Sequence, residues 1–531
     1  MAHMMSLKTF RLLDTGHLSA AANMALDQII LDEVSNFTSP PTLRFLQFRP
    51  AAALVGYHQD VSLEVRLDYC AEHGIDVNRR HTGGGAILFQ ESAIGWEIFG
   101  VPGQPPFQGS YETILTRIGA IAASGLSRLG IPAAFRPRND IEVHGRKISG
   151  TGGVSISRGL MFQGTVLVEN EVELFLRALR VPIEKLKKRE IQSLMERICF
   201  LSDLMDPPPP VDLIKEQLAA EFATQLKVDL EPGDLTEREK QSLEQEIAFF
   251  ESPKWVLSRS RPHREGEPVR SIAQTEAGTL RVHLWVAPGG RRIRQALISG
   301  DFFAVPSRLV HDLEAVLVGV HAEGGALRTA VARFFQSYAG NMLGIEPAQV
   351  AEAVAAAAER LDLLDESFSP NEANELFLLN LGPQDLPHHR PQWLLLPYCS
   401  KNIDCTFRKV PGCDECGSCE IGECFELARG FDMVPITIQS FEHLMEILSH
   451  RCARENGMYV GSCCEAFYAK HQMEMEQTGA RGVLVNLDST TCYDLGKGTS
   501  AYKGDFENKT SLNLKLISKT LTCLHAHHSI H

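Results

Sequence analysis

Three consecutive glycines preceded by two arginines form the first pattern in this chain that could do chemistry. They lie in the segment RRHTGGGAILF, residues 79–89, between two apolar runs that predict strands. Three glycines leave the backbone uncovered, so its N–H groups can close on a carboxylate or a phosphate, and Arg79 and Arg80 add positive charge. A Rossmann-type loop would lead into a helix, whereas this loop leads into a strand. The pattern favours an anionic ligand, although alone it also fits a glycine hairpin with solvated arginines.

A second segment, NDIEVHGRKISGTGG at residues 139–153, is typical of a hairpin whose second strand opens with Lys147. Small neighbouring residues let this lysine approach a ligand, where its ammonium would neutralise a phosphate and polarise an acyl anhydride. Asp140 offers the oxygen ligand that Mg²⁺ prefers. Taken separately, Lys147 fits an ordinary surface lysine and Asn139-Asp140 an ordinary turn, so the prediction depends on the two segments together.

Cysteines form the third pattern, because ten of the thirteen fall between Cys399 and Cys492. Three successive Cys-x-x-Cys-like steps in CDECGSCEIGEC let several thiolates face one centre, as zinc or an iron–sulfur cluster requires. The side chains of the vicinal pair Cys463-Cys464 diverge, so symmetric ligation of one ion by both is disfavoured. A zinc scaffold, an iron–sulfur cluster and a metal-free module all stay open. The predicted ligands are Cys399, Cys405, Cys413, Cys416, Cys419, Cys424, Cys463, Cys464 and Cys492.

The elements that must position these residues divide into three units, as expected for 531 residues. We predict a mixed α/β catalytic domain over residues 6–250, in which the charged helical stretch from about 184 is a connector rather than core. A small α+β domain follows over 260–365, with a hairpin at its Pro-Gly-Gly turn. A polar linker at 366–392 leads to a cysteine-rich metal-binding α/β domain at 393–518.

Composition narrows the function classes. The formal charge of -14 gives no overall basic field for nucleic acid or an anionic membrane. No apolar run of about 20 residues could span a bilayer, and the N-terminus lacks a secretory signal, so we expect a cytoplasmic protein. In that reducing compartment, clustered cysteines indicate metal ligands or reactive groups rather than disulfides.

The two glycine-containing segments, in this order and separation, resemble the lipoate–protein ligase family. VGYHQ at residues 55–59 and FQGTVLV at 162–168 fit the same pattern, and ISGDFF at 298–303 is similar to the accessory domain of ligases that perform both half-reactions. The resemblance implies the mixed sheet with helices shared by biotin and lipoate ligases. It implies that Lys147 is catalytic and that substrate or nucleotide is bound by Arg79, Arg80, Gly83, Gly84, Gly85, Ala86, Asn139, Asp140, Gly150, Thr151 and Gly164.

The implied reaction has two steps. The acid first attacks the α-phosphate of ATP, with Mg²⁺ as cofactor, to form an acyl-adenylate and pyrophosphate. A lysine of a lipoyl carrier domain then takes the acyl group and releases AMP. The resemblance implies lipoate or octanoate as the acid, and as carrier a 2-oxoacid dehydrogenase E2 or a glycine-cleavage H-type protein.

Two alternatives stay open. Related acyltransferases use a cysteine thioester in place of ATP, but no cysteine lies between Cys70 and Cys199, and both of these are expected in the core. Biotin ligation is less favoured because its usual glycine–arginine loop does not stand at residues 79–85. The cysteine-rich region resembles an uncharacterised bacterial cysteine-rich domain family. We interpret it as a structural zinc module or as a redox-sensing or docking unit for lipoate assembly.

Overall fold

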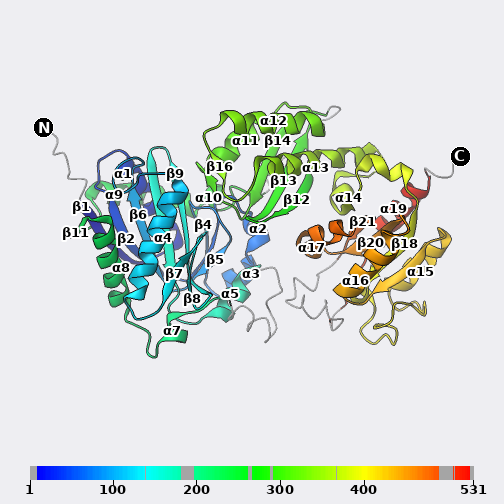
Figure 1. The fold of residues 1–531 in the computed structure, drawn as a ribbon, viewed down its shortest axis with the longest axis horizontal. Coiled ribbons are helices and arrows are strands. Elements are labelled where there is room, and N and C mark those ends of the chain that lie inside the picture. The colour runs from blue at the N-terminus through cyan, green and yellow to red at the C-terminus, as the bar shows by residue number, and fades with distance from the viewer. Residues whose placement is uncertain are drawn as a thin grey trace.

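The computed structural model describes residues 9–137, 139–180, 197–260, 266–287, 291–365, 368–488, 506 and 509–526. Figure 1 shows three consecutive units: an N-terminal unit of residues 9–260, a smaller middle unit of residues 266–365, and a C-terminal unit of residues 368–526. Each unit packs around a hydrophobic core of its own. The fold is mixed α/β, as the sequence predicts.

The N-terminal unit is built on a large sheet of eight strands in the order β11-β1-β2-β6-β10-β9-β8-β7. Strand β1 pairs in parallel with β2 and β11, while the ladder from β2 through β6 to β7 is antiparallel. The sheet is therefore mixed. Its strands are β1 (Thr9–Leu18), β2 (Thr42–Phe48), β6 (Ile94–Gly100), β7 (Ala133–Arg136), β8 (Asp140–Val143), β9 (Arg146–Ile156), β10 (Gly159–Val166) and β11 (Asp229–Pro232).

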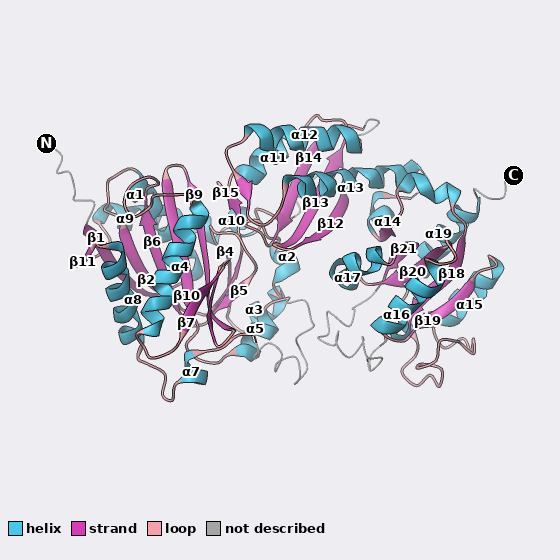
Figure 2. Cartoon of the chain, in the orientation of Figure 1, coloured by secondary structure: helices cyan, strands magenta, loops and turns pink. Residues whose placement is uncertain are grey.

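Helices cover both faces of the large sheet. Helix α1 (Ala20–Ser35) packs with α9 (Glu237–Glu251), and α4 (Tyr111–Ser127) packs with α8 (Val211–Leu226). Alternating residues of one strand serve the two sides, because Phe162 packs in the core under α4 whereas Met161 packs in the core under α1. In Figure 2, α4 lies in front of the magenta strands of this sheet. The side chain of Ser19 caps α1 by accepting from the amide of Ala22.

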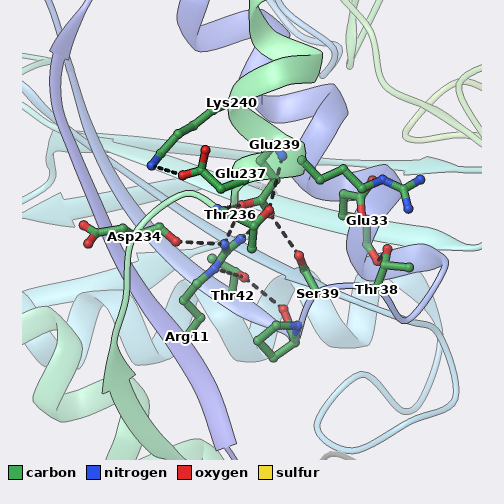
Figure 3. A network of polar contacts seen from close by, with 12 residues as sticks. Arg11, Glu33, Thr38, Ser39, Thr42, Asp234, Thr236, Glu237, Glu239 and Lys240 are labelled. Carbon is green, nitrogen blue, oxygen red and sulfur yellow. Dashed lines mark hydrogen bonds and ion pairs between the residues drawn. The ribbon is translucent and has the colours of Figure 1, made fainter. Parts of the chain in front are cut away.

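Helix α9 is attached to the sheet edge by a buried polar network, drawn in Figure 3. The guanidinium of Arg11 on β1 donates to both carboxylate oxygens of Glu239 at 2.7 and 2.8 Å. Glu239 also accepts from Ser39, and it completes a reciprocal capping box with Thr236 at the start of the helix. One carboxylate thus begins the helix and fixes it to β1.

A second, three-stranded sheet of the N-terminal unit carries the glycine loop. Strand β3 (Ala52–Val55) lies between β4 (Asp76–Arg79) and β5 (Ile87–Phe89), and residues 80–86 connect the outer two. As predicted, the loop leads from one strand into another. The short helices of this unit are α2 (Val61–Glu64), α3 (Leu67–Glu72), α5 (Val172–Ala178), α7 (Leu201–Leu204) and α10 (Pro253–Val256).

The middle unit packs helices against an antiparallel sheet of β12 (Val269–Thr275), β13 (Gly278–Val286) and β14 (Ile293–Gly300). A short ribbon of β15 (Ala304–Val305) and β16 (Asn341–Met342) lies beside it. The helices are α11 (Leu309–Leu317), α12 (Gly324–Ser337) and α13 (Pro347–Asp365).

The C-terminal unit has a five-stranded sheet in the order β17-β21-β20-β18-β19, all parallel except β17. Its strands are β17 (Leu376–Leu379), β18 (Pro391–Pro397), β19 (Val434–Ile438), β20 (Met458–Cys463) and β21 (Arg481–Asn486). The helices are α14 (Pro370–Asn374), α15 (Glu420–Gly430), α16 (Phe441–Ile447), α17 (Glu465–Gln477) and α19 (Leu514–Ala526), with short turns η1 (Pro383–His388), η2 (Tyr398–Ser400) and η3 (Leu448–Cys452).

Two segments differ from the sequence prediction. The stretch predicted as a linker at 366–392 contains α14, η1 and β17, an edge strand of the C-terminal sheet whose apolar residues are mostly buried. The charged stretch predicted as a connector contains α8 and α9. Helix α8 supplies Ile214, Leu218 and Phe222 to one buried core, and α9 supplies Phe250 to another. In both cases a few apolar positions at regular spacing outweigh a polar or charged composition. Among the described residues, no helix is long and apolar enough to cross a membrane.

Candidate active site

Arg79, at the end of β4, supports the glycine loop from behind. Its side chain has 0% exposure and donates to the backbone carbonyls of Gly56, Tyr57 and Gln59. It also donates to the carbonyls of Trp255 and Val256 in α10. Burial, followed by the nearby charge of Arg259, lowers the pKa of Arg79 to about 9. Arg79 does not line the cavity described below, so the prediction that it binds substrate is not supported. Its guanidinium instead joins β4 to residues 56–59 and to residues 255–256.

Arg80 shapes the glycine loop itself. Its guanidinium donates to the carbonyls of Gly83 and Gly85 at 2.7 and 2.8 Å. It also donates to the carbonyl of Leu54 and to the hydroxyl of Thr82. Burial lowers the pKa of this guanidinium to about 10, so it stays charged at neutral pH. Among the described residues, the amides of Gly83 and Gly85 have no hydrogen-bond partner. The loop therefore turns carbonyls toward Arg80 and leaves two amide donors for a ligand.

Lys147 and Asp140 face each other across the hairpin of β8 and β9. The Nζ of Lys147 lies 2.6 Å from Oδ1 of Asp140, and both side chains are partly exposed. A Cβ built on Gly150 would lie 3.2 Å from that Nζ, so the ammonium rests over a position without a side chain. The backbone of Lys147 is fixed by hydrogen bonds with Arg197 and Cys199. Because a partly exposed ion pair contributes little free energy, an anionic ligand can replace Asp140 at low cost.

The glycine loop and Lys147 line one cavity of about 430 Å³. The predicted site residues on its wall are Arg80, Gly83, Gly84, Gly85, Ala86, Asn139, Asp140, Lys147, Gly150, Thr151 and Gly164. The structure thus places every predicted residue of the N-terminal site except Arg79 on one cavity wall. Further lining residues that sequence reasoning missed include Met24, Leu46, Phe48, Phe89, Trp96, Glu97, Gln163 and Phe303. The volume falls within the range of small-molecule sites.

The cavity has an apolar part and a polar part. Trp96 is fully buried, and Gly164 gives it room, since a Cβ there would lie 2.4 Å from the indole ring. Next to it, Glu97 shares the guanidinium of Arg44 with Asp27, at 3.0 and 2.8 Å. Burial raises the pKa of both carboxyls, and their repulsion favours a shared proton. The apolar residues suit a hydrocarbon chain, whereas the loop amides and Lys147 suit its carboxyl end.

The middle unit closes one side of this cavity. The amide of Gly84 donates to the carbonyl of Phe302 at 3.0 Å, and a Cβ on Gly83 would lie 2.3 Å from that oxygen. The ring of Phe303 approaches Gly84 and Gly152, where added Cβ atoms would lie 2.8 and 3.2 Å from it. The glycines therefore also permit the close approach of another unit. The segment ISGDFF, which contains both phenylalanines, resembles an accessory domain, but nothing local in its sequence predicts this contact with the glycine loop.

Neither cysteine of the N-terminal unit is a nucleophile at this site. Burial raises the thiol pKa of both Cys70 and Cys199 to about 11. Both are buried in hydrophobic cores, as predicted, and neither is among the described residues that line the cavity. A thioester on this wall would need a thiol that the described part of the unit does not supply.

The cysteines of the C-terminal unit separate into different places. Cys405, Cys413, Cys416 and Cys419 line a cavity of about 260 Å³ in the loop after η2. Lys401 ties this loop together by donating to the carbonyls of Phe407, Val410 and Gly412. Within the described residues, no group of three or more His, Cys, Asp or Glu side chains is arranged to hold a metal ion.

The remaining predicted metal ligands lie elsewhere. Cys424 is fully buried on α15 among Ile421 and Phe425, in the hydrophobic core of the unit. Cys399, Cys463 and Cys464 line another cavity, at the ends of β18 and β20. Cys492 lies outside the described residues. The structure therefore places the eight described cysteines of the predicted set in three places: the loop cavity, the core around α15, and the cavity at the ends of β18 and β20.

Comparisons with known proteins agree with the fold. The family described as "Lipoyl protein ligase A/B catalytic domain" matches residues 19–223. Octanoyltransferase LipM of Kyrpidia tusciae is 30% identical over 272 residues, 47% of this chain and 98% of that protein. Octanoyltransferase LipM of Moorella thermoacetica is 30% identical over 279 residues, 48% of this chain and 100% of that protein.

Among solved structures, P. falciparum LipL1 in complex with lipoate is 16% identical, with a TM-score of 0.51, over 65% of this chain and 98% of that chain. This likeness concerns the fold alone. Fold and relatives together define an enzyme of the lipoate ligase and transferase class. The chain belongs to the lipoyl protein ligase A/B catalytic domain family, through its N-terminal half.

Proposed function

We propose that the N-terminal and middle units form an ATP-dependent lipoate–protein ligase. The observation that carries this proposal is the shared cavity, where Lys147 lies opposite the uncovered amides of the glycine loop. A cation and free backbone donors at one end of a partly apolar cavity match a carboxylate that is activated by a phosphate. The absence of a thiol from the described wall favours activation by ATP over a thioester route.

In the first step, the cavity holds the acid with its chain along Trp96 and its neighbours and its carboxylate near Lys147. The carboxylate attacks the α-phosphate of ATP, the α–β phosphoanhydride bond breaks, and pyrophosphate leaves. Lys147 neutralises the growing negative charge on the transferred phosphate, and the amides of Gly83 and Gly85 donate to phosphate or carboxylate oxygens. Asp140, freed from its ion pair, would hold Mg²⁺, which offsets phosphate charge when bound.

In the second step, the ε-amine of a carrier lysine attacks the acyl carbonyl of the adenylate and AMP leaves. Lys147 stabilises the phosphate leaving group through its fixed position over Gly150. We propose a lipoyl domain as the acceptor, of the 2-oxoacid dehydrogenase E2 or glycine-cleavage H type, and the cytoplasm as the place of reaction. The acceptor must approach from the exposed side of Lys147 and Asp140.

Octanoyl transfer without ATP is the second candidate, and one specific observation favours it. The two relatives at 30% identity are both named octanoyltransferase. Such a reaction would use the same cavity for an octanoyl chain and the same carrier lysine. A covalent route would require a cysteine thioester, yet Cys70 and Cys199 do not line the cavity.

Pyrophosphate exchange separates the two candidates. The full chain is incubated with labelled pyrophosphate, ATP and, in turn, lipoate, octanoate, biotin or no acid. The ligase proposal predicts exchange that depends on lipoate or octanoate. In a parallel assay without ATP, an octanoylated carrier is offered to an unmodified lipoyl domain, and the product is weighed by mass spectrometry. Transfer there, with no acid-dependent exchange, would establish the transferase and overturn the ligase.

For the C-terminal unit, we propose a metal centre at the loop cavity, which would form when a metal draws the loop thiols together, because among the described residues they are not arranged as a ligand set. Four thiols on one wall, Cys405, Cys413, Cys416 and Cys419, offer the soft ligands that zinc and iron–sulfur clusters take. Anaerobic purification, metal analysis and a visible spectrum test this proposal. Stoichiometric zinc without colour indicates a scaffold, and a brown protein indicates a cluster with redox or docking roles in lipoate assembly. Protein without metal that remains folded would refute it.

A further inference from the structure

The C-terminal sheet reverses its strand order between β18 and β20. From β18 the chain proceeds to β19 on one side, and then to β20 and β21 on the other. β18 is parallel to both neighbours, so the carboxyl ends of β18 and β20 open on the same edge of the sheet. In open α/β sheets, ligands bind outside the carboxyl ends of strands at such a reversal. The topology therefore marks this edge, which the proposed ligase site and the cysteine loop do not use.

Two thiols lie just beyond this edge, Cys399 in η2 after β18 and Cys464 directly after β20. Leu395 of β18 pairs with Gly461 of β20, so Cys399 and Cys464 follow this pair by similar numbers of residues. They are 7% and 5% exposed and share a hydrophobic cluster with Tyr398 and Phe506. Both are free thiols. The two paired strands that lead to them are about 4.8 Å apart, a spacing that brings residues just past their ends close enough for thiol–disulfide chemistry.

Polar contacts fix one of these thiols. The hydroxyl of Thr510 donates to Sγ of Cys399 at 3.2 Å, and the amide of Thr510 donates to the carbonyl of Cys399 at 2.9 Å. Cys464 is the N-cap residue of α17, a 13-residue helix, and its side chain makes no capping hydrogen bond. Burial raises the pKa of Cys399 to about 11, the hydrogen bond from Thr510 opposes this shift, and the nearby Cys464 adds to it.

Cys399 and Cys464 line a cavity of about 100 Å³, and Cys463, the last residue of β20, lines it as well. Its other lining residues are mostly apolar and include Pro397, Ile438, Phe441, Leu444, Phe467 and Leu487. An apolar cavity that holds benzene has roughly 150 Å³, so this smaller one admits at most a smaller ring, and its apolar lining disfavours a charged cofactor. Thiols react with soft electrophiles, above all with disulfides. A five-membered ring containing a disulfide satisfies both the shape and the chemistry.

We propose that this cavity binds the 1,2-dithiolane ring of a lipoyl group and reduces it by thiol–disulfide exchange with Cys464 and Cys399. The inference rests on the proposed function for the identity of the ring, since lipoate carries a dithiolane at the end of its aliphatic chain. It assigns to the C-terminal unit a second site, for the sulfur end of the group whose carboxyl end the N-terminal site handles.

The exchange balances without any further reactant. The thiolate of Cys464 attacks one ring sulfur, the ring S–S bond breaks, and a mixed disulfide forms while the other ring sulfur leaves and takes up the proton lost from Cys464. The thiolate of Cys399 then attacks Sγ of Cys464 and expels the second lipoyl sulfur, which takes the proton from Cys399. Two electrons pass from the two cysteines to the ring, leaving a Cys399–Cys464 disulfide and a dihydrolipoyl dithiol. The reverse sequence oxidises a dihydrolipoyl group.

The test uses the full chain, reduced and freed of reductant under argon, with lipoamide as the neutral dithiolane probe. We expect the intact mass to fall by two hydrogens as dihydrolipoamide appears, and peptide mapping to find Cys399 joined to Cys464. Octanamide, which has the chain without the ring, should cause no change. In Cys399→Ser, the mixed disulfide should be trapped on Cys464; in Cys464→Ser, the exchange rate should fall at least about 100-fold.

Cys452→Ala is the matched control, because Cys452 is equally buried in the neighbouring core but does not line the cavity. It should react as the wild type does. If the cysteine variants fail to fold, Ile438→Phe keeps both thiols and fills the cavity, and it should slow lipoamide while sparing the smaller oxidant hydrogen peroxide. Equal lipoamide rates in wild type and the Cys399/Cys464 double serine variant, or a disulfide formed only within the Cys405–Cys419 loop, would overturn the proposal.

Failure of the proposed function would look different. Lys147→Ala should lower acid-dependent pyrophosphate exchange by roughly 10²–10³-fold and leave lipoamide reduction unchanged. If lipoamide is reduced at Cys399 and Cys464 but no lipoate-dependent exchange or transfer occurs, the second site stands and the ligase assignment falls. If exchange and transfer occur but the cysteine pair does not react, the ligase stands and the second site falls.

Discussion

The amide of Gly84 donates a hydrogen bond to the carbonyl of Phe302 at 3.0 Å, across the boundary between the N-terminal and middle units. The same glycine loop faces Lys147 across the cavity. A single loop therefore contacts both the middle unit and the proposed ligand. Because the two contacts share a backbone segment of three glycines, ligand binding and docking of the middle unit cannot be independent.

The first prediction concerns this docking. In Gly83→Ala, the new Cβ would lie 2.3 Å from the carbonyl oxygen of Phe302, a backbone atom that cannot rotate away. The middle unit must then shift or detach, and we expect limited proteolysis between the two units to become at least several-fold faster. Gly85→Ala adds a Cβ that meets nothing within 4 Å, and it should dock as the wild type does. Equal proteolysis of both variants and wild type would show that the loop does not fix the unit.

The second prediction concerns Lys147. Removal of its ammonium in Lys147→Ala should lower the rate of acid-dependent pyrophosphate exchange by roughly 10²–10³-fold, as for the loss of one charge-stabilising donor. Lys240 on α9 pairs with Glu237 at the surface, so Lys240→Ala serves as the control and should exchange normally. Lys147→Arg keeps the charge but not the shape, and it should recover part of the rate. Near-normal exchange by Lys147→Ala would remove this lysine from the mechanism.

The third prediction concerns pH and Glu64, which pairs with Arg281 of the middle unit at 3.5 Å. Burial raises the pKa of Glu64 from 4.5 to about 7, although Arg281 opposes the shift. A raised pKa means that folding favours the protonated form. This contribution to stability is complete below pH 4.5 and is lost as pH rises through about 7.

The glutamine of Glu64→Gln cannot ionise, so this variant does not lose folding stability at this position as the pH rises. Its free energy of unfolding, relative to the wild type, should rise between pH 5 and pH 8 by up to about 3 kcal/mol. Urea denaturation at a series of pH values measures the difference. Glu244→Gln, an exposed position on α9, should follow the wild-type profile. If the free energies of unfolding of Glu64→Gln and wild type changed in parallel with pH, the raised pKa of Glu64 would be contradicted.

Much of the ligase site could be predicted from the sequence, because its parts are local. The glycine loop lies between two short strands, and the Lys147 hairpin turns within a few residues, so composition and spacing determine both. The family pattern implies that both segments belong to one site, and the cavity that they share agrees with it. Local chemistry thus identified the residues, while only the fold supplies their distances.

The role of Arg79 could not be predicted, since it depends on contacts distant in sequence. Its guanidinium meets the carbonyls of Trp255 and Val256, about 176 positions away, and buries itself among them. In the sequence, Arg79 and Arg80 are adjacent and equally charged, so nothing local distinguishes their roles. The backbone carbonyls turned toward each guanidinium decide that Arg79 supports the loop from behind and Arg80 from within.

The cysteine pattern was similarly ambiguous. Cys424 continues the Cys-x-x-Cys-like run, but it also continues a helical apolar spacing with Ile421, Phe425 and Ala428, and the helix places it in the core. That periodicity was present in the sequence and could have separated Cys424 from the loop cysteines. No comparable pattern marks Cys399 and Cys464, which are brought together only because β18 and β20 are neighbours.

The last prediction concerns the buried pair of Arg11 and Glu239 (Figure 3). Glu239→Gln leaves the Arg11 guanidinium charged and buried at 7% exposure beside a neutral amide, and breaking one side of such a pair costs about 3–5 kcal/mol. Denaturant unfolding should show this loss together with earlier melting of α9. Glu237→Gln, two residues away and 80% exposed, should cost under about 1 kcal/mol.

The double variant Arg11→Met with Glu239→Leu separates the two physical causes of that loss. Because a buried ion pair pays a large desolvation cost, two apolar side chains of similar size can match or exceed its stability. Glu239 also accepts from Ser39 and from the amide of Thr236, which Leu cannot replace. We therefore expect the double variant to recover the part of the loss due to the unpaired charge and to retain about 1–2 kcal/mol from the lost helix cap. Full recovery would show that the cap contributes nothing, and no recovery would show that the charge of Arg11 was never the cause.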